Sequence, residues 1–158
     1  VFHIMKHDIL KGDVTMSCDV YTVNDFFIEQ LPQVQAVHFW IACGEYRRME
    51  ITEEKYIDTV DRIMKSLDDI ELNRLTQILI NVYHLTRQTK VTRHFLMRLT
   101  TRFGGTNIRL IIYQITEAYN HCRAQHTKRA MNFDIIIISN PKKRILLTIY
   151  PKDVWNND

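Results

Sequence analysis

The sequence predicts an α+β fold, with a core of five or six helices flanked by β-hairpins at the N- and C-terminal ends. Two patterns support this class. Apolar residues alternate with polar ones near both ends of the chain, as in strands, and recur with a period of 3.6 between those ends, as in amphipathic helices. The 158 residues, 46% of them hydrophobic, are enough for one globular core. We therefore expect a single domain over residues 1–158, with its helical core over 24–125.

The N-terminal β-hairpin is predicted over Val1–Tyr21. Its turn signal is Lys11-Gly12-Asp13, because glycine and aspartate favour tight turns. The residues after this turn alternate with the period of a strand, and the apolar positions are Val14, Met16, Cys18 and Val20.

The first two helices are predicted on either side of Pro32. Asn24 or Asp25 is expected to cap a short helix over Phe26–Leu31, because both side chains accept hydrogen bonds from the first turn. Proline is tolerated at the first helical position, so Pro32 is expected to open a second helix that runs to about Arg48.

Two further helices are predicted, each with a cap and one apolar face. Thr52 is the expected N-cap of the third helix, which runs to about Leu67, and Asp68 or Asp69 starts the fourth. The apolar faces consist of Tyr56, Ile57, Val60, Ile63, Met64 and Leu67 in the third helix, and of Leu72, Leu75, Ile78, Leu79, Val82 and Tyr83 in the fourth.

The fifth and sixth helices are predicted over about Val91–Phe103 and Asn107–Ala124. Gly104-Gly105 separates them, because glycine readily takes the left-handed conformation that ends helices. The apolar stripe of the sixth helix consists of Ile108, Ile111, Ile112, Ile115, Tyr119 and Cys122.

The C-terminal β-hairpin is predicted over residues 132–150, and a tail over 151–158 follows. Two runs rich in β-branched residues, Phe133–Ile138 and Arg144–Tyr150, flank a turn that contains Asn140-Pro141. Because chain ends often lie close together, we expect the two hairpins to join in one antiparallel sheet, or to pair at an edge with another copy.

The sequence shows no signal for a membrane-spanning or secreted protein. The longest apolar run, Ile135–Ile138, is far shorter than the roughly 20 residues that span a bilayer. The first residues lack the basic-then-apolar order of a secretory signal. Cys18, Cys43 and Cys122 are an odd number at wide spacing, which argues against a disulfide framework. We expect the protein in the cytoplasm or nucleus, including the cytoplasm of an infected host cell.

No linear motif for catalysis or metal binding is present. His121, Cys122 and His126 provide too few ligands for a structural zinc site, which takes four, and Cys122 belongs to the apolar stripe. No serine lies in a nucleophile motif, and Cys43 is interpreted as a small buried residue. We expect no metal, no cofactor and no enzymatic activity, although a site assembled only by tertiary contacts leaves no such motif.

Charge is strongly separated along the chain. The net charge is +3, but residues 1–86 hold eight Lys and Arg against fourteen Asp and Glu, a balance of −6. Residues 87–150, the basic half, hold twelve Lys and Arg against only Glu117 and Asp134, a balance of +10. Arginine outnumbers lysine there, and its planar guanidinium suits phosphate. The alternatives are that these charges face solvent or pair with the acidic half of the chain.

A ladder of cations is predicted on the fifth helix. On a helical projection, four side chains spaced four residues apart advance by about 40° each, namely Lys90, His94, Arg98 and Arg102. Arg93 and Met97 flank this ladder. Like charges at this spacing destabilise their own helix by roughly 0.2–0.5 kcal/mol per pair, which an anionic partner would relieve.

Further residues of the basic half extend the predicted anion-binding surface, namely Arg87, Arg109, Arg123, Lys128, Arg129, Lys142, Lys143 and Arg144. Tyr113 projects to the polar side of the sixth helix and is added as an aromatic contact. Trp40, Tyr46 and Trp155 are other aromatics able to stack on bases. The stretch Phe103–Asn107 resembles a phosphate-cradling loop before a helix N-terminus and is predicted as an auxiliary anion site.

Three classes of function are consistent with these features. The first is a non-enzymatic module that binds a polyanion through residues 87–150, with RNA favoured over DNA and no sequence specificity. The second is a self-assembling structural or scaffold protein, such as a viral matrix-like or shell protein. It would form homo-oligomers through charge-complementary faces or hairpin edges, or would lie on an anionic membrane. The third is a helical protein–protein docking domain with an exposed apolar groove. The charge asymmetry favours the first class.

Overall fold

The computed structural model describes residues 21–83, 85 and 89–153, which form six helices and a four-stranded mixed sheet, and this confirms the predicted α+β class. The predicted N-terminal hairpin lies outside the described residues except for Tyr21. In chain order the described elements are α3 (Val23–Gln30), α4 (Gln33–Arg47), α5 (Glu53–Lys65), α6 (Asp69–Tyr83), β1 (Lys90–Val91), α7 (Arg93–Phe103), α8 (Ile108–Gln125), β2 (Arg129–Asn132), β3 (Ile135–Asn140) and β4 (Ile145–Pro151).

All six predicted helices are present, and most of their starts follow from local capping. Thr52 caps α5 as expected, because its hydroxyl oxygen accepts a 3.1 Å hydrogen bond from the Lys55 backbone N–H. The prediction for α3 was wrong about the cap. Thr22 precedes α3 and accepts from the Asp25 N–H, while the Asp25 carboxylate accepts from the Thr22 N–H. This reciprocal capping box starts the helix at Val23, so Asp25 supports the cap from inside the first turn.

Gly104 ends α7 for a different reason from the one predicted. Its φ and ψ are −56° and −35°, and no described glycine has a positive φ. A Cβ at this position would lie 2.5 Å from the Thr100 carbonyl oxygen and 2.6 Å from both amide atoms of Asn24. Glycine is therefore required by close packing of α3 against α7. The left-handed conformation is found instead at His126, the C-cap of α8, with a φ of 55°.

The sheet has the strand order β1-β4-β3-β2. The predicted C-terminal hairpin is confirmed as β3 and β4, in which Ile136 lies opposite Tyr150 in an antiparallel register. Strands β1 and β2 were not predicted. β1 pairs with β4 in parallel, so the described sheet is mixed. The expected joining of the two hairpins in one sheet involves residues outside the described part of the chain.

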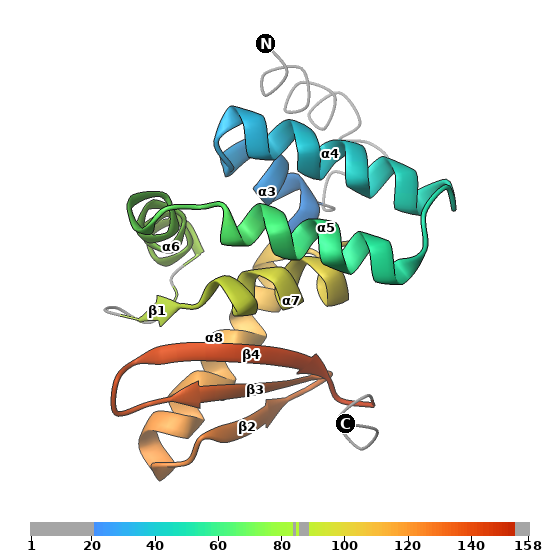
Figure 1. Cartoon of the computed structure of the whole chain (residues 1–158). Helices are drawn as coiled ribbons and strands as arrows, with labels where there is room; N and C mark the ends of the chain where they lie inside the picture. The colour runs from blue at the N-terminus through green and yellow to red at the C-terminus, as the bar shows by residue number, and fades with distance from the viewer. Residues whose placement is uncertain (1–20, 84, 86–88, 154–158) are drawn as a thin grey trace, which may run out of the picture.

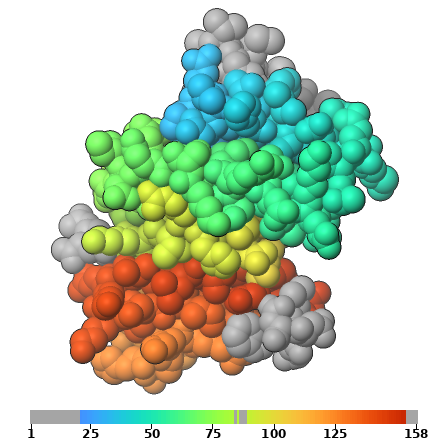
Figure 2. Space-filling view, in the orientation of Figure 1, coloured from blue at the N-terminus to red at the C-terminus, as the bar shows by residue number. Residues whose placement is uncertain are grey.

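The helices form layers on one side of the sheet and along its edge. Figure 1 shows α8 behind the strands, α7 beside β4, and then α5 and α4 farther from the sheet. Figure 2 shows these layers as successive bands of colour. The predicted apolar stripe of α8 is buried at every position, whereas Val82 of α6, predicted as apolar core, is half exposed. The core therefore lies between the sheet and the helices and leaves the opposite face of the sheet without a helical cover among the described residues.

Candidate nucleic-acid interface

Six cations of the basic half lie at one end of the sheet. Lys90 pairs with Ile145 at the start of β4, and Arg129 pairs with Ile138 near the end of β3. The turn between β3 and β4 joins these same two strand ends, at the left of the sheet in Figure 1. We name this group the sheet-end cluster, and its members are Lys90, Lys128, Arg129, Lys142, Lys143 and Arg144.

Backbone hydrogen bonds fix the three segments that carry this cluster. The Lys90 N–H donates to the Arg144 carbonyl at 2.8 Å, and the Ser139 N–H donates to the Lys128 carbonyl at 2.8 Å. Within the turn, the Lys143 N–H donates to the Asn140 side-chain oxygen at 3.1 Å. Lys128, Lys142 and Lys143 are exposed. The cluster therefore presents exposed charged ends on a backbone held by hydrogen bonds.

The predicted ladder on the fifth helix is interrupted at its start. Lys90 belongs to strand β1, because Thr92 caps α7 and the helix begins only at Arg93. Arg93 was predicted to flank the ladder, but its guanidinium donates to the Leu67 carbonyl at 2.9 Å and to the Asp69 carboxylate at 2.8 Å. This ion pair is one instance of the alternative in which the basic half pairs with the acidic half.

Arg102, at the other end of the ladder, contacts the sheet. Its guanidinium donates to the Ile149 carbonyl at 3.0 Å and lies 4.3 Å from the centre of the Tyr150 ring. Arg102 thereby binds the edge of β4 that the two-residue strand β1 leaves uncovered. The side chain has a structural role that the helical projection did not predict.

The middle of the ladder lies close to α5. The pKa of His94 is lowered by partial burial and by the nearby charges of Arg98 and Arg102. Met97, predicted beside the exposed face, is buried. Fewer residues of α7 therefore face solvent than the helical projection of the sequence predicted.

The predicted residues of α8 form a separate group. Arg109 is exposed, with its guanidinium 5.9 Å from the centre of the Tyr83 ring, and Tyr113 is 55% exposed, as predicted for its position. Both lie in the first half of α8, whereas Arg123 lies in the last turn, which leads toward Lys128. Arg87 lies outside the described residues.

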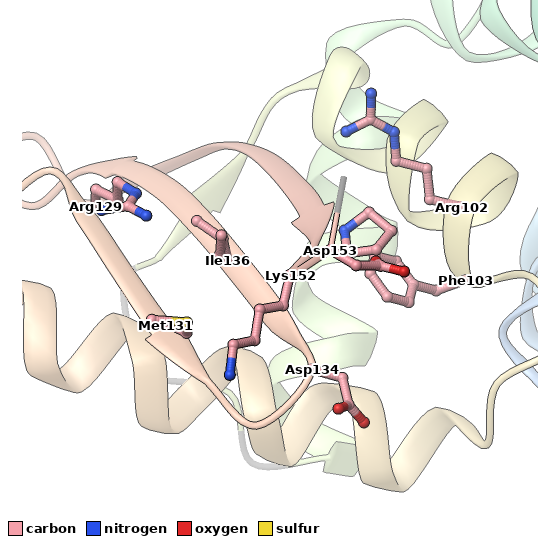
Figure 3. A pocket seen from close by; sticks show the side chains of 9 residues that line it. Arg102, Phe103, Arg129, Met131, Asp134, Ile136, Lys152 and Asp153 are labelled. Carbon is pink, nitrogen blue, oxygen red and sulfur yellow. The ribbon is translucent and has the colours of Figure 1, made fainter. Parts of the chain in front are cut away.

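The face of the sheet opposite α8 contains a shallow cavity of about 640 Å³ (Figure 3). Met131, Ile136 and Tyr150 occupy adjacent positions across three strands, so their side chains point to the same face. The cavity is lined by Arg102, Phe103, Arg129, Met131, Asp134, Ile136, Pro151, Lys152 and Asp153. Figure 3 shows Lys152 extending across the face toward Met131. The sequence did not reveal this site because strand β2 was not predicted. The one local pattern that pointed to it was the adjacent basic pair Lys128-Arg129.

Groups for metal chemistry are not assembled within residues 21–83, 85 and 89–153. No set of three His, Cys, Asp or Glu side chains there has the arrangement of a metal site, and Cys122 is fully buried. Ser66 donates its hydroxyl to the Ile63 carbonyl, which is a helix-terminal contact. No helix in the same part of the chain is long and apolar enough to cross a membrane.

No family model, curated protein or solved structure matches the chain. Function is therefore inferred from the arrangement of side chains, above all from the six cations of the sheet-end cluster.

Proposed function

We propose that the protein binds nucleic acid without sequence specificity, with RNA favoured over DNA, through the sheet-end cluster. One observation carries the proposal. Three segments far apart in the sequence, around Lys90, Lys128 and Lys142, are held together at one end of the sheet, and none of them contains an acidic residue. The two acids of the basic half lie elsewhere, Asp134 at the opposite hairpin turn and Glu117 on α8.

Electrostatics explains why such a cluster favours a polyanion. Like charges held close together repel one another, and a phosphate backbone replaces this repulsion with attraction. Neighbouring strands lie roughly 4.8 Å apart, so the cluster spans about 14 Å across β1, β4, β3 and β2. This width allows several phosphates to be contacted at once. Phosphate contacts carry no sequence information, which is why specificity is not expected.

RNA is favoured because the face of the sheet that no described helix covers lies beside the cluster. Met131 is half exposed there, Ile136 beside it is buried, and the Tyr150 ring in line with them also contacts the Arg102 guanidinium. Unpaired bases bind such sheet faces by stacking, whereas a duplex keeps its bases inside.

The test is binding of a fluorescein-labelled 20-nucleotide uridine RNA, measured by anisotropy across a salt series. We expect the logarithm of the affinity to fall linearly with the logarithm of salt concentration, as counterion release requires. The double variant Lys142→Glu/Lys143→Glu should bind more weakly, with a slope reduced by about 1.4 if each lysine contacts one phosphate of a single strand.

The matched control is Lys55→Glu/Arg62→Glu, which makes the same change of charge at exposed positions of α5. It should retain nearly all of the wild-type affinity. Absence of binding by the wild type at low salt, or equal loss in both double variants, would show that the sheet-end cluster is not a nucleic-acid site.

A second candidate function, self-assembly as a structural or scaffold protein, is supported by the exposed apolar side of α4. Val34 is 65% exposed and Ile41 is 47% exposed, and Val37 lies between them on the same helical stripe. Exposed apolar stripes of this kind often mark interfaces. In such a protein the sheet-end cluster would contact anionic lipid or the acidic half of another copy.

Light scattering distinguishes this candidate from the first. Self-association without nucleic acid that disappears in Val34→Lys/Ile41→Lys would favour assembly through α4. A monomer at all salt concentrations would leave nucleic-acid binding as the supported function.

A further inference from the structure

A second cavity, of about 670 Å³, lies between the helices and apart from the sheet-end cluster. Its lining residues come from α3, α4, α5 and the C-terminal end of α7, and none belongs to the cluster. This size is typical of a pocket for a small organic ligand. The residues that line it are Thr22, Asn24, Asp25, Ile28, Trp40, Cys43, Tyr46, Arg47, Tyr56, Thr100, Thr101, Arg102, Gly104 and Gly105.

Aromatic rings form one wall of this cavity. The Tyr46 ring stacks on the Tyr56 ring with a centroid distance of 4.4 Å and an interplanar angle of 3°. Tyr56 is buried, its hydroxyl lies 3.5 Å from the Cys43 sulfur, and burial raises the pKa of its phenol, so the ring stays neutral and fixed. Trp40 lies one to two turns earlier on α4 and is 48% exposed. The wall can therefore hold a flat ring by stacking.

An unpaired hydrogen-bond acceptor lies among the same residues. The side-chain oxygen of Asn24 is buried and has no hydrogen-bond partner among the described residues. The absence of a side chain on Gly104 creates the space that this amide occupies, as the 2.6 Å approach shows. Burying an unpaired carbonyl costs free energy, so a ligand that donates an N–H to it would recover that loss.

The edge of the cavity is positively charged. Arg47 is exposed at the end of α4 and lines the cavity. Arg102 lines it from α7, although its guanidinium also bonds to the Ile149 carbonyl. Among the described residues, Asp25 is the only acid that lines the cavity, and its carboxylate takes part in the cap of α3. An exposed arginine at this edge favours an anionic group on the ligand.

From this juxtaposition we infer that the cavity binds a nucleoside monophosphate. The base stacks against the aromatic wall, a base N–H donates to the Asn24 oxygen, and the phosphate pairs with Arg47. This inference does not depend on the proposed function, because no residue of the sheet-end cluster lines this cavity.

Tryptophan fluorescence provides the test. The chain has two tryptophans, so the variant Trp155→Phe leaves Trp40, in the cavity wall, as the reporter. We expect AMP to change the fluorescence with saturation, adenosine to bind more weakly, and inorganic phosphate alone to cause no change. GMP, CMP and UMP, titrated in parallel, show which base fits best.

Two variants locate the ligand. Arg47→Glu, in the same background, should weaken AMP at least tenfold and leave adenosine unaffected, and Tyr46→Ala should weaken both. The matched control Arg62→Glu, on an exposed arginine that does not line the cavity, should bind AMP like the parent. Far-ultraviolet circular dichroism checks that each variant is folded. Absence of saturable binding by all four nucleotides at millimolar concentration, or AMP binding that Arg47→Glu leaves unchanged, would overturn the inference.

Discussion

The backbone N–H of Lys90 donates a 2.8 Å hydrogen bond to the carbonyl oxygen of Arg144. This bond starts the parallel pairing of β1 with β4 and brings two members of the sheet-end cluster side by side. Because the bond uses main-chain atoms, the side chain of Lys90 is not needed to form it.

Replacement of Lys90 therefore separates binding from folding. We expect Lys90→Gln to keep the wild-type melting temperature and to reduce the salt slope of RNA binding by about 0.7, the value for one phosphate contact on a single strand. Anisotropy across a salt series and a thermal melt measure the two quantities. A lower melting temperature together with an unchanged slope would contradict this assignment.

Arg102 and Arg98 should differ in their effects on stability. Arg102→Ala removes a hydrogen bond from a charged donor to the Ile149 carbonyl, so the free energy of unfolding should fall by about 1.5–3 kcal/mol. Arg98→Ala should change it by no more than about 0.5 kcal/mol, because Arg98 makes no ion pair with the described residues. Urea denaturation at neutral pH measures both. Equal effects would mean that the contact of Arg102 with the sheet contributes little.

The two adjacent glycines should respond in opposite ways to alanine. Gly104→Ala places a methyl group against the Thr100 carbonyl and the Asn24 amide, and overpacking of this kind lowers the free energy of unfolding by about 1–3 kcal/mol. Gly105→Ala meets open space at a negative φ, and should raise that free energy by up to about 1 kcal/mol by restricting the unfolded chain. The pair is compared by thermal or urea unfolding.

His94 should make stability depend on pH in mildly acidic solution. Its pKa in the folded protein is lowered, first by burial and then by Arg98 and Arg102, whereas an unfolded histidine has a pKa of about 6.5. The unfolded chain therefore takes up the proton first. The contribution of neutral His94 is complete above pH 6.5 and is lost as the pH falls from there through the lower pKa of the folded state.

The variant His94→Gln isolates this effect. As the pH falls from 7.5 to 5, the free energy of unfolding of the wild type should decrease more than that of His94→Gln. In Arg98→Gln the corresponding loss should be smaller, because one of the charges that lower the pKa of His94 is gone. If the difference between the two proteins is constant with pH, the pKa of His94 in the folded protein is not lower than in the unfolded chain.

Local signals in the sequence were enough to locate all six helices. Thr52 caps α5 and the isoleucines of α8 form a buried stripe because both features depend on residues within one or two turns. The hairpin of β3 and β4 was predicted for the same reason. The strand β2 was not, since Arg129–Asn132 buries only Ala130 and contains no β-branched residue.

The arrangement of the cations depends on contacts between distant segments. The sequence therefore located the cations but could not show that six of them lie at one end of the sheet. The spacing of four residues between cations continues from His94 back to Lys90, and this pattern wrongly placed Lys90 on the helix. Thr92 was the available signal against it, because its hydroxyl oxygen accepts from the Phe95 N–H and starts α7 at the next residue. The pairing that places Lys90 beside the hairpin turn joins it to β4, which no local pattern reveals.

Strand β4 is the last described element of the chain, yet it lies between β1 and β3 and also packs on α7. A ribosome adds residues at about 5–20 per second, and domains generally fold from the N-terminal side first. While β4 is still inside the ribosome, the helices can pack but Lys90 has no strand to pair with. A nascent chain that ends at Arg144 already carries all six cations of the sheet-end cluster, but they do not meet until the residues through Pro151 have emerged. The proposed binding through this cluster would thus require the completed strand, and unfinished chains would not compete for the same partner.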